Sequence, residues 1–250
     1  MERWQNKVAV VTGASSGIGA AVCKVLIENG MIVVGLARRL VKMNTTMSKT
    51  IPQDKQHNFH GFKCDVSDEQ SIKETFAWIE EKFGGLDVLI NNAGVVKKTT
   101  ILTENNSEDL LSTINTNVLG VAWCTREAFR SMRQRGGNGH VIIINSVAGH
   151  KIPNIPGISL NIYPPSKHAV TAMTEILRQE FANEKTKIKV TSLSPGGVRT
   201  EIAGGASMAI PSGIPILEAE DIANGVLFCL QTPPHVQIHE LTIQAVGEMF

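Results

Sequence analysis

The sequence predicts an α/β fold, in which an open parallel β-sheet of about seven strands is covered by helices on both faces. Short apolar runs alternate with helical stretches of roughly 10–15 residues along the whole chain. The run at 141–144 is uninterrupted and β-branched, which is typical of a strand buried in the middle of a parallel sheet. No internal repeat and no linker interrupts this order, so residues 1–250 are expected to form a single domain.

The individual elements follow from the positions of these runs. The expected strands are the apolar runs at 8–11, 31–36, 59–64, 86–90, 141–144, 189–193 and 238–243. The expected helices, whose apolar positions recur with a helical period, lie at 19–29, 69–83, 109–135, 166–184 and 219–230. Residues 41–58 are expected as a poorly specified helix or loop. Residues 202–216 contain three glycines and two prolines and are expected to form a flexible flap.

The composition excludes several classes of protein. The chain has 24 Lys and Arg residues against 23 Asp and Glu residues, and a net charge of +1 argues against a dedicated nucleic-acid binder. Hydrophobic residues make up 42% of the chain, which is enough to bury a sizeable core. No apolar run approaches the ~18–20 residues that cross a bilayer, so no membrane span is expected.

The cysteines and histidines indicate a reducing compartment and no metal site. Cys23, Cys64, Cys124 and Cys229 lie far apart without a C-x-x-C pair, so neither a zinc finger nor a disulfide framework is expected. The seven histidines form no metal-binding cluster. Because the start of the chain is charged and lacks the apolar core of a secretory signal, a cytoplasmic location is expected.

A glycine-rich turn follows the first expected strand and opens the first expected helix. Residues 12–19 have the pattern T-G-x-x-x-G-I-G. Glycines allow the backbone to approach a pyrophosphate, and a helix start directs free N–H groups toward it. Such turns also occur as purely structural connections, but this position and spacing favour a dinucleotide site. The residues expected to bind the cofactor here are Gly13, Ser15, Ser16, Gly17, Ile18 and Gly19.

Two arginines at the end of the second expected strand indicate the type of dinucleotide. A fold that prefers NAD places a carboxylate there, which accepts hydrogen bonds from the adenosine ribose. This chain has Arg38 and Arg39 instead. Guanidinium groups bind a 2′-phosphate through charge-assisted hydrogen bonds. The alternative is a pair of solvated surface arginines, but the position favours NADP(H) over NAD(H).

The single tyrosine of the chain, Tyr163, lies four residues before Lys167 at an expected helix start. Residues at this spacing share one face of a helix. A nearby ammonium is expected to lower the pKa of the phenol from about 10 toward neutrality, which would make Tyr163 a general acid or base. The Y-x-x-x-K spacing is common, however, and has no functional meaning without partners.

Polar motifs follow other expected strands, at the edge of the sheet where ligands bind in this architecture. Asn145 and Ser146 follow the strand at 141–144, and the sequence Asn-Asn-Ala-Gly occupies 91–94. Residues 195–200 read Pro-Gly-Gly-Val-Arg-Thr after a later strand. Their shared position predicts one site at this edge.

Asn117 lies within an expected helix, an unusual place for a side chain that competes with the helical backbone. Together with the motifs above and Asp65-Val66, it completes a set that resembles the classical short-chain dehydrogenase/reductase family. The resemblance covers nearly the whole chain, with its motifs in the correct order. It implies a Rossmann fold in which hydride passes between a nicotinamide and a substrate alcohol or carbonyl.

The resemblance also implies a role for each site residue. Tyr163 would be the acid or base, Lys167 its pKa partner and a ribose contact, and Ser146 a donor to the substrate oxygen. Tyr163 and Ser146 would therefore both bind the substrate. Asn117 is similar to the family residue that holds a water in the proton relay behind the lysine. The other implied cofactor contacts are Asp65 and Val66 at the adenine, Asn92, Ala93 and Gly94 at the ribose, and Val198 and Thr200 at the carboxamide.

Shorter matches at 124–128, 144–150 and 232–239 resemble the insect farnesol dehydrogenase-like branch and the vertebrate dehydrogenase/reductase SDR family member 11 branch. They imply an apolar alcohol or its carbonyl as substrate, with farnesol the first candidate. A broad-specificity NADPH-dependent carbonyl or ketosteroid reductase is an alternative. A catalytically silent binder of small hydrophobic molecules is another, although the intact catalytic set argues against it. The family also implies a homodimer or homotetramer that pairs through the helices at 109–135 and 166–184.

Overall fold

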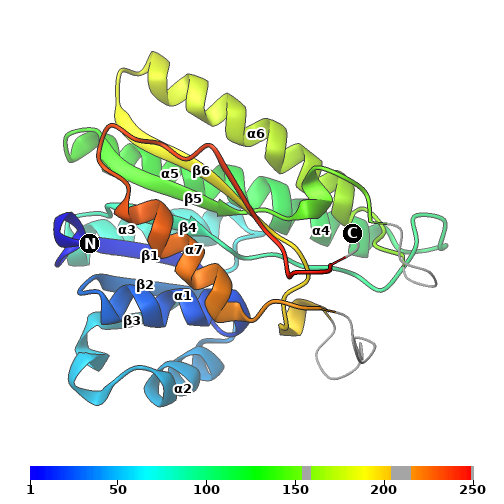
Figure 1. The fold of residues 1–250 in the computed structure, drawn as a ribbon, viewed down its shortest axis with the longest axis horizontal. Coiled ribbons are helices and arrows are strands. Elements are labelled where there is room, and N and C mark those ends of the chain that lie inside the picture. The colour runs from blue at the N-terminus through cyan, green and yellow to red at the C-terminus, as the bar shows by residue number, and fades with distance from the viewer. Residues whose placement is uncertain (154–158, 204–214, 249–250) are drawn as a thin grey trace.

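The strands form one parallel sheet in the order β3-β2-β1-β4-β5-β6-β7 (Figure 1). This computed structural model describes residues 1–153, 159–203 and 215–248. The strands are β1 (Val8–Thr12), β2 (Ile32–Ala37), β3 (Phe59–Lys63), β4 (Val88–Asn91), β5 (Asn138–Ile144), β6 (Lys187–Pro195) and β7 (Glu240–Ile243). The predicted α/β class and the seven-stranded parallel sheet are confirmed.

Helices cover both faces of the sheet (Figure 1). They are α1 (Gly17–Glu28), α2 (Leu40–Thr50), α3 (Glu69–Phe83), α4 (Ser107–Ile114), α5 (Gly120–Gln134), α6 (Tyr163–Asn183) and α7 (Ala219–Gln231). Helices α1 and α7 enclose one core, which includes Leu26 and Val226. Helices α3, α5 and α6 enclose a second core on the other face, which includes Phe76, Met132 and Val170.

The central strands contain apolar runs because the side chains of these runs supply both cores. Successive side chains of a strand point to opposite faces of the sheet. Strand β1 accordingly places Ala9 and Val11 in the first core and Val8 and Val10 in the second. This double burial explains why the strands appear in the sequence as unbroken apolar runs rather than as alternating patterns.

The stretch at 41–58, which the sequence left open between helix and loop, is largely helical. Helix α2 ends at Thr50, and a 3₁₀ helix follows at Gln53–Asn58. Met43 and Met47, four residues apart, are buried in the first core together with Ile51. Burial of this apolar face therefore stabilises a helix whose residues have weak intrinsic preference for one.

Two other helices differ in detail from the prediction. The helix expected at 109–135 is interrupted between α4 and α5 by a π-helical turn, Asn115–Leu119. Helix α6 begins at Tyr163, three residues earlier than expected, with Pro164 and Pro165 in its first turn. Proline is tolerated there because the first N–H groups of a helix have no intrahelical acceptor.

The flap predicted at 202–216 falls mostly on residues 204–214, outside the described part of the chain. Its described ends are anchored near the sheet. Ile202 belongs to a short 3₁₀ turn at Glu201–Ala203. At the other end, Leu217 forms a parallel bridge with Val198.

Candidate active site

The predicted site residues gather at the carboxyl ends of four adjacent strands. Strands β1, β4, β5 and β6 lie side by side (Figure 1) and end at Thr12, Asn91, Ile144 and Pro195. Because the strands are parallel, the segments that follow them meet at one edge of the sheet. These segments are the glycine-rich loop and residues 92–95, 145–149 and 196–201.

The glycine-rich loop is tied to the segment after β4. The Thr12 hydroxyl accepts hydrogen bonds from the backbone N–H groups of Asn92 and Ala93, both at 3.0 Å. The Asn92 side chain in turn donates to the carbonyl oxygens of Thr12 (2.8 Å) and Gly13 (3.3 Å). Asn92 and Ala93 therefore fix the backbone position of the loop.

Close packing within this loop requires glycine at two positions. Gly13 has a φ of +69°, and a Cβ there would lie 2.9 Å from the Cα of Ala93. A Cβ on Gly19 would lie 2.4 Å from the Gly13 carbonyl oxygen. The N-cap residue Ser16 makes no side-chain hydrogen bond to the helix start, so the first N–H groups of α1 are left for another acceptor. This arrangement fits a dinucleotide pyrophosphate.

Substitution of Gly19 by alanine is expected to weaken NADPH binding by about tenfold or more and to lower the free energy of unfolding by about 1–3 kcal/mol. The new methyl group would displace the Gly13 carbonyl, and with it the loop. Calorimetric titration and urea unfolding measure the two effects. Ala21→Ser, which adds one heavy atom at a half-buried position of the same helix, is the control. Unchanged NADPH affinity in Gly19→Ala would contradict this role of the loop.

The segment after β6 packs against the same loop. A Cβ on Gly17 would lie 2.9 Å from the Cγ2 atom of Thr200. Val198 is buried, and the N–H of the next residue, Arg199, donates to the Leu217 carbonyl at 2.8 Å. The structure thus brings Thr200 to the start of α1, and the other predicted carboxamide contact, Val198, lies in the same segment.

A basic cluster lies beside the glycine-rich loop. The Arg39 guanidinium donates to the hydroxyls of Ser15 (3.2 Å) and Ser16 (3.5 Å). Lys42, in the first turn of α2, joins it, because both cations contact the carboxylate of Glu201. Arg38 is exposed at the same strand end. Lys42 was not among the predicted site residues, although its position three residues after Arg39, the N-cap of α2, places the two on one side of the helix start.

Asp65 and Val66 follow β3, at the expected adenine side of the site. The Asp65 carboxylate accepts hydrogen bonds from the Ser67 N–H (3.0 Å) and hydroxyl (2.7 Å). Val66 is buried, and its carbonyl oxygen would lie 2.6 Å from a Cβ on Gly120. At the carboxyl end of this outer strand, Asp65 is thus held by Ser67, and Val66 packs closely against Gly120.

Ser146 and Tyr163 come together through a hydrogen bond between their side chains. Ser146 lies two residues after the end of β5, and its Oγ atom accepts a hydrogen bond from the Ala148 N–H at 3.1 Å. This contact leaves the serine proton available for donation to the phenol oxygen. Tyr163 is half-buried at the first position of α6.

Lys167 is buried one helical turn after Tyr163. Its Nζ atom lies 5.7 Å from the centroid of the tyrosine ring and donates to the Ile144 carbonyl at 2.9 Å. Burial lowers the pKa of Lys167 from 10.5 to about 8. Burial also raises the pKa of Tyr163 above its usual value of 10, and the hydrogen bond with Ser146 only partly offsets this rise. The structure therefore contradicts the predicted lowering of the Tyr163 pKa, because desolvation of the phenol outweighs the effect of its hydrogen bond with Ser146.

Asn117 occupies the π-helical turn and is buried. Its side chain accepts a hydrogen bond from the Val95 N–H (2.9 Å) and donates to the Val95 carbonyl (3.0 Å) and the Ser166 hydroxyl (3.2 Å). Ser166 in turn donates to the Tyr163 carbonyl at 2.6 Å. Asn117 thus joins the segment after β4 to the helix turn that carries Tyr163. Val95 and Ser166 were not among the predicted site residues, although Ser166 directly precedes Lys167.

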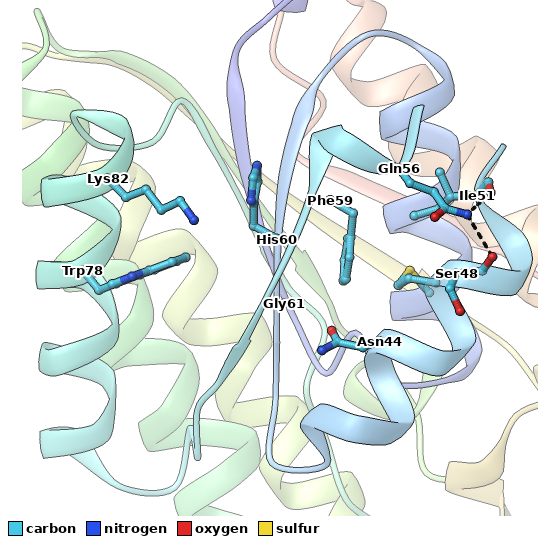
Figure 2. A pocket seen from close by; sticks show the side chains of 10 residues that line it. Asn44, Ser48, Ile51, Gln56, Phe59, His60, Gly61, Trp78 and Lys82 are labelled. Carbon is cyan, nitrogen blue, oxygen red and sulfur yellow. Dashed lines mark hydrogen bonds between the residues drawn. The ribbon is translucent and has the colours of Figure 1, made fainter. Parts of the chain in front are cut away.

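A separate surface depression of about 340 Å³ lies at the outer edge of the sheet. Figure 2 shows Phe59 and His60 of β3 at its centre, with Ser48 of α2 on one side and Trp78 of α3 on the other. Phe59 and His60 form the amino end of β3, whereas the predicted site lies at the carboxyl ends of the strands. None of the predicted site residues lines this depression.

Comparison with known proteins identifies the family. The family model described as short chain dehydrogenase matches residues 7–209. The chain belongs to the short-chain dehydrogenase family. Relatives of this short-chain dehydrogenase include the farnesol dehydrogenase of Aedes aegypti, which is 51% identical over 250 residues and matches 100% of both chains. The dehydrogenase/reductase SDR family member 11 of Mus musculus is 39% identical over 259 residues, covering 100% of this chain and 98% of the relative.

Solved structures of similar fold hold a nicotinamide cofactor. A serine dehydrogenase complexed with NADP⁺ has a TM-score of 0.84 and 26% identity, covering 97% of this chain and 96% of its own. An alcohol dehydrogenase from Thermococcus sibiricus, complexed with 5-hydroxy-NADP, has a TM-score of 0.84 and 27% identity, covering 98% of both chains. The resemblance inferred from the motifs is confirmed: this short-chain dehydrogenase is an oxidoreductase, and its structural relatives support a nicotinamide cofactor.

Proposed function

We propose that this protein is an NADP-dependent alcohol dehydrogenase or carbonyl reductase, with farnesol as the first candidate substrate. The observation that carries the proposal is the meeting of Ser146, Tyr163 and Lys167 beside the glycine-rich loop, at one edge of the sheet. The 51% identity with the mosquito farnesol dehydrogenase over the full length supports an isoprenoid alcohol. Residues 1–250 are proposed to act as one domain.

The side chains divide the proposed chemistry among them. Tyr163 would take the proton from a substrate hydroxyl, or return it to a carbonyl oxygen. Ser146 would donate a hydrogen bond to the same oxygen. When bound, the nicotinamide supplies or accepts the hydride at the carbinol carbon. Lys167 would place a positive charge behind the tyrosine, and Asn117 would position both through Ser166.

The preference for NADP is proposed from the basic cluster. Arg39 and Lys42 provide a guanidinium and an ammonium next to the serine hydroxyls of the glycine-rich loop, and Arg38 is exposed at the same strand end. Charge-assisted hydrogen bonds from such groups suit a 2′-phosphate. The proposed cofactor contacts otherwise remain those of the predicted set: the glycine-rich loop, Asp65, Val66, residues 92–94, Tyr163, Lys167, Val198 and Thr200.

An apolar substrate is supported by the side chains at the described end of the flap. The Cδ1 atom of Ile202 would lie 3.6 Å from a Cβ on Gly94, so an aliphatic side chain faces the segment after β4. Val147, next to Ser146, is also apolar and buried. Such a wall favours an alkyl or isoprenoid group over a sugar or an amino acid.

A substrate panel with the purified chain tests this function. Oxidation of farnesol with NADP⁺ and with NAD⁺ is followed by the absorbance of the reduced nicotinamide, and a short hydrophilic alcohol is the control. We expect kcat/KM for farnesol with NADP⁺ to exceed both comparisons by at least about tenfold, a factor that corresponds to about 1.4 kcal/mol. Equal values with NAD⁺ would contradict the cofactor preference, and absence of farnesol turnover would contradict the substrate.

A broad-specificity NADPH-dependent carbonyl reductase is the second candidate. The 39% identity with the mouse dehydrogenase/reductase SDR family member 11 favours it. Reduction of diketones and ketosteroids with NADPH, measured in the same panel, separates it from a farnesol dehydrogenase. A catalytically silent binding protein would turn over no member of the panel.

The proposed assembly is a homodimer or homotetramer that pairs through the helices predicted at 109–135 and 166–184, which correspond to α4 with α5 and to α6. Ile176 on α6 and Leu111 on the adjoining α4 are large hydrophobic residues with exposed fractions of 53% and 61%, which supports a covered surface there. Size-exclusion chromatography with light scattering tests this assembly. No described helix is long and apolar enough to cross a membrane. A cytoplasmic location stays a proposal.

A further inference from the structure

Glu201 occupies the basic cluster that the proposed function assigns to the 2′-phosphate of NADP. Its Oε2 atom lies 3.1 Å from Nη2 of Arg39, and its other oxygen contacts the ammonium of Lys42. The cations belong to the segment after β2, whereas Glu201 follows Thr200 after β6. One carboxylate therefore bridges two cations that lie about 160 residues before it in the chain.

The carboxylate is ionised at neutral pH. Hydrogen bonding from Lys42 lowers the pKa of Glu201 below its usual value of 4.5, and Arg39 adds to the effect. Both cations thus face a full negative charge. A carboxylate and a phosphate have the same preference for guanidinium and ammonium donors, so they would compete for the same N–H groups.

The ion pairs of Glu201 with Arg39 and Lys42 are expected to add little to the stability of the fold. The side chains of Arg39, Lys42 and Glu201 are 55%, 39% and 47% exposed. Exposed pairs of this kind contribute little to folding because water and salt screen them. Because folding explains little of this contact, we relate the position of Glu201 on the two cations to cofactor binding at the neighbouring glycine-rich loop.

We propose that Glu201 acts as an internal competitor of the cofactor 2′-phosphate and limits the preference of the protein for NADP over NAD. A 2′-phosphate reaches Arg39 and Lys42 only by displacing the Glu201 carboxylate. NAD carries no phosphate at this position and pays no such cost. The inference rests on the proposed function, since it requires that the basic cluster faces the adenosine ribose.

Fragment binding tests this without turnover. Adenosine 2′,5′-bisphosphate carries the 2′-phosphate, and 5′-AMP lacks it; both are titrated calorimetrically into the full chain. Glu201→Gln is expected to tighten binding of the bisphosphate about 3- to 10-fold and to leave 5′-AMP within about twofold, as for the loss of one exposed competing ion pair. The Kd ratio of NAD⁺ to NADP⁺ is expected to rise by the same factor.

The matched control is Glu184→Gln. Glu184 pairs with Arg133 at 2.8 Å, and its side chain is 46% exposed, so this variant makes the same charge change at a similar exposure. Equal tightening of both fragments, or no tightening of the bisphosphate, in Glu201→Gln would overturn the proposal. Equal binding of the two fragments by the wild type would contradict the proposed NADP preference, whatever the result for Glu201→Gln. The two failures are thus distinguishable in one data set.

Discussion

Substitution of Tyr163 by phenylalanine is expected to lower kcat by about 10²- to 10⁴-fold, the contribution typical of a positioned general acid or base. The change removes only the phenol oxygen. The ring keeps its place at the start of α6, and the loss is confined to the hydrogen bond with Ser146. The NADPH dissociation constant and the melting temperature are therefore expected to stay near the wild-type values. Steady-state kinetics with farnesol and NADP⁺ measure the effect.

Tyr163 is the single tyrosine of the sequence, so the ionisation of its phenol can be observed directly by absorbance. An alkaline titration of the tyrosine absorbance reports Tyr163 alone, and the transition must vanish in Tyr163→Phe. In nucleotide-free protein we expect a pKa above 10, because burial disfavours the phenolate. A titration near neutral pH would contradict this assignment, and full turnover by Tyr163→Phe would overturn the proposed mechanism.

Substitution of Lys167 by methionine is expected to reduce kcat by about 10²-fold or more, because Tyr163 loses the nearby positive charge that stabilises a developing phenolate. Methionine is similar in length and apolar, so it fills the buried space of the lysine stem. The control is Lys187→Met, which removes an exposed lysine at the start of β6 and is expected to keep wild-type turnover. Equal activity of the two variants would contradict the role of Lys167.

The difference in free energy of unfolding between the wild type and Lys167→Met is also expected to depend on pH, which it would not if Lys167 only filled space. The folded protein releases the Lys167 proton at about pH 8, whereas the unfolded chain holds it up to 10.5. In this window the unfolded state binds more protons, so rising pH favours the folded wild type. The free energy of unfolding of the wild type, relative to Lys167→Met, should therefore rise by up to about 3 kcal/mol across the window. Urea unfolding at about pH 8 and about pH 10.5 measures this difference in free energy. A difference that does not change with pH would contradict the lowered pKa of Lys167.

Local signals in the sequence were sufficient where one type of interaction dominates. The predicted helix at 69–83 matches α3 residue for residue, because Asp68 caps it and Gly84 ends it in a left-handed conformation. The positions of the central strands were also clear, since a run that is buried on both faces requires apolar side chains. Helix α2 was not clear, because Met43 and Met47 gain their stabilisation from a core formed by distant parts of the chain.

In the candidate site, too, some features follow from the sequence and others depend on contacts between distant residues. The glycine positions, the Tyr163–Lys167 spacing and the order of the motifs were sufficient to predict the family, because each depends on neighbours in the chain. The link from Asn117 through Ser166 to Tyr163, and the contact of Glu201 with Arg39, join residues far apart in sequence. Spacing alone contains no information about such contacts.

The sequence by itself thus determined the α/β fold, the family and the set of residues that meet at one edge of the sheet. Parallel strands bring their carboxyl ends together whatever the details of packing, so this result follows from the order of the elements. Only the tertiary structure decided the protonation of the site. The pKa values of Tyr163 and Lys167 depend on how much water burial removes, and burial is a property of the assembled core.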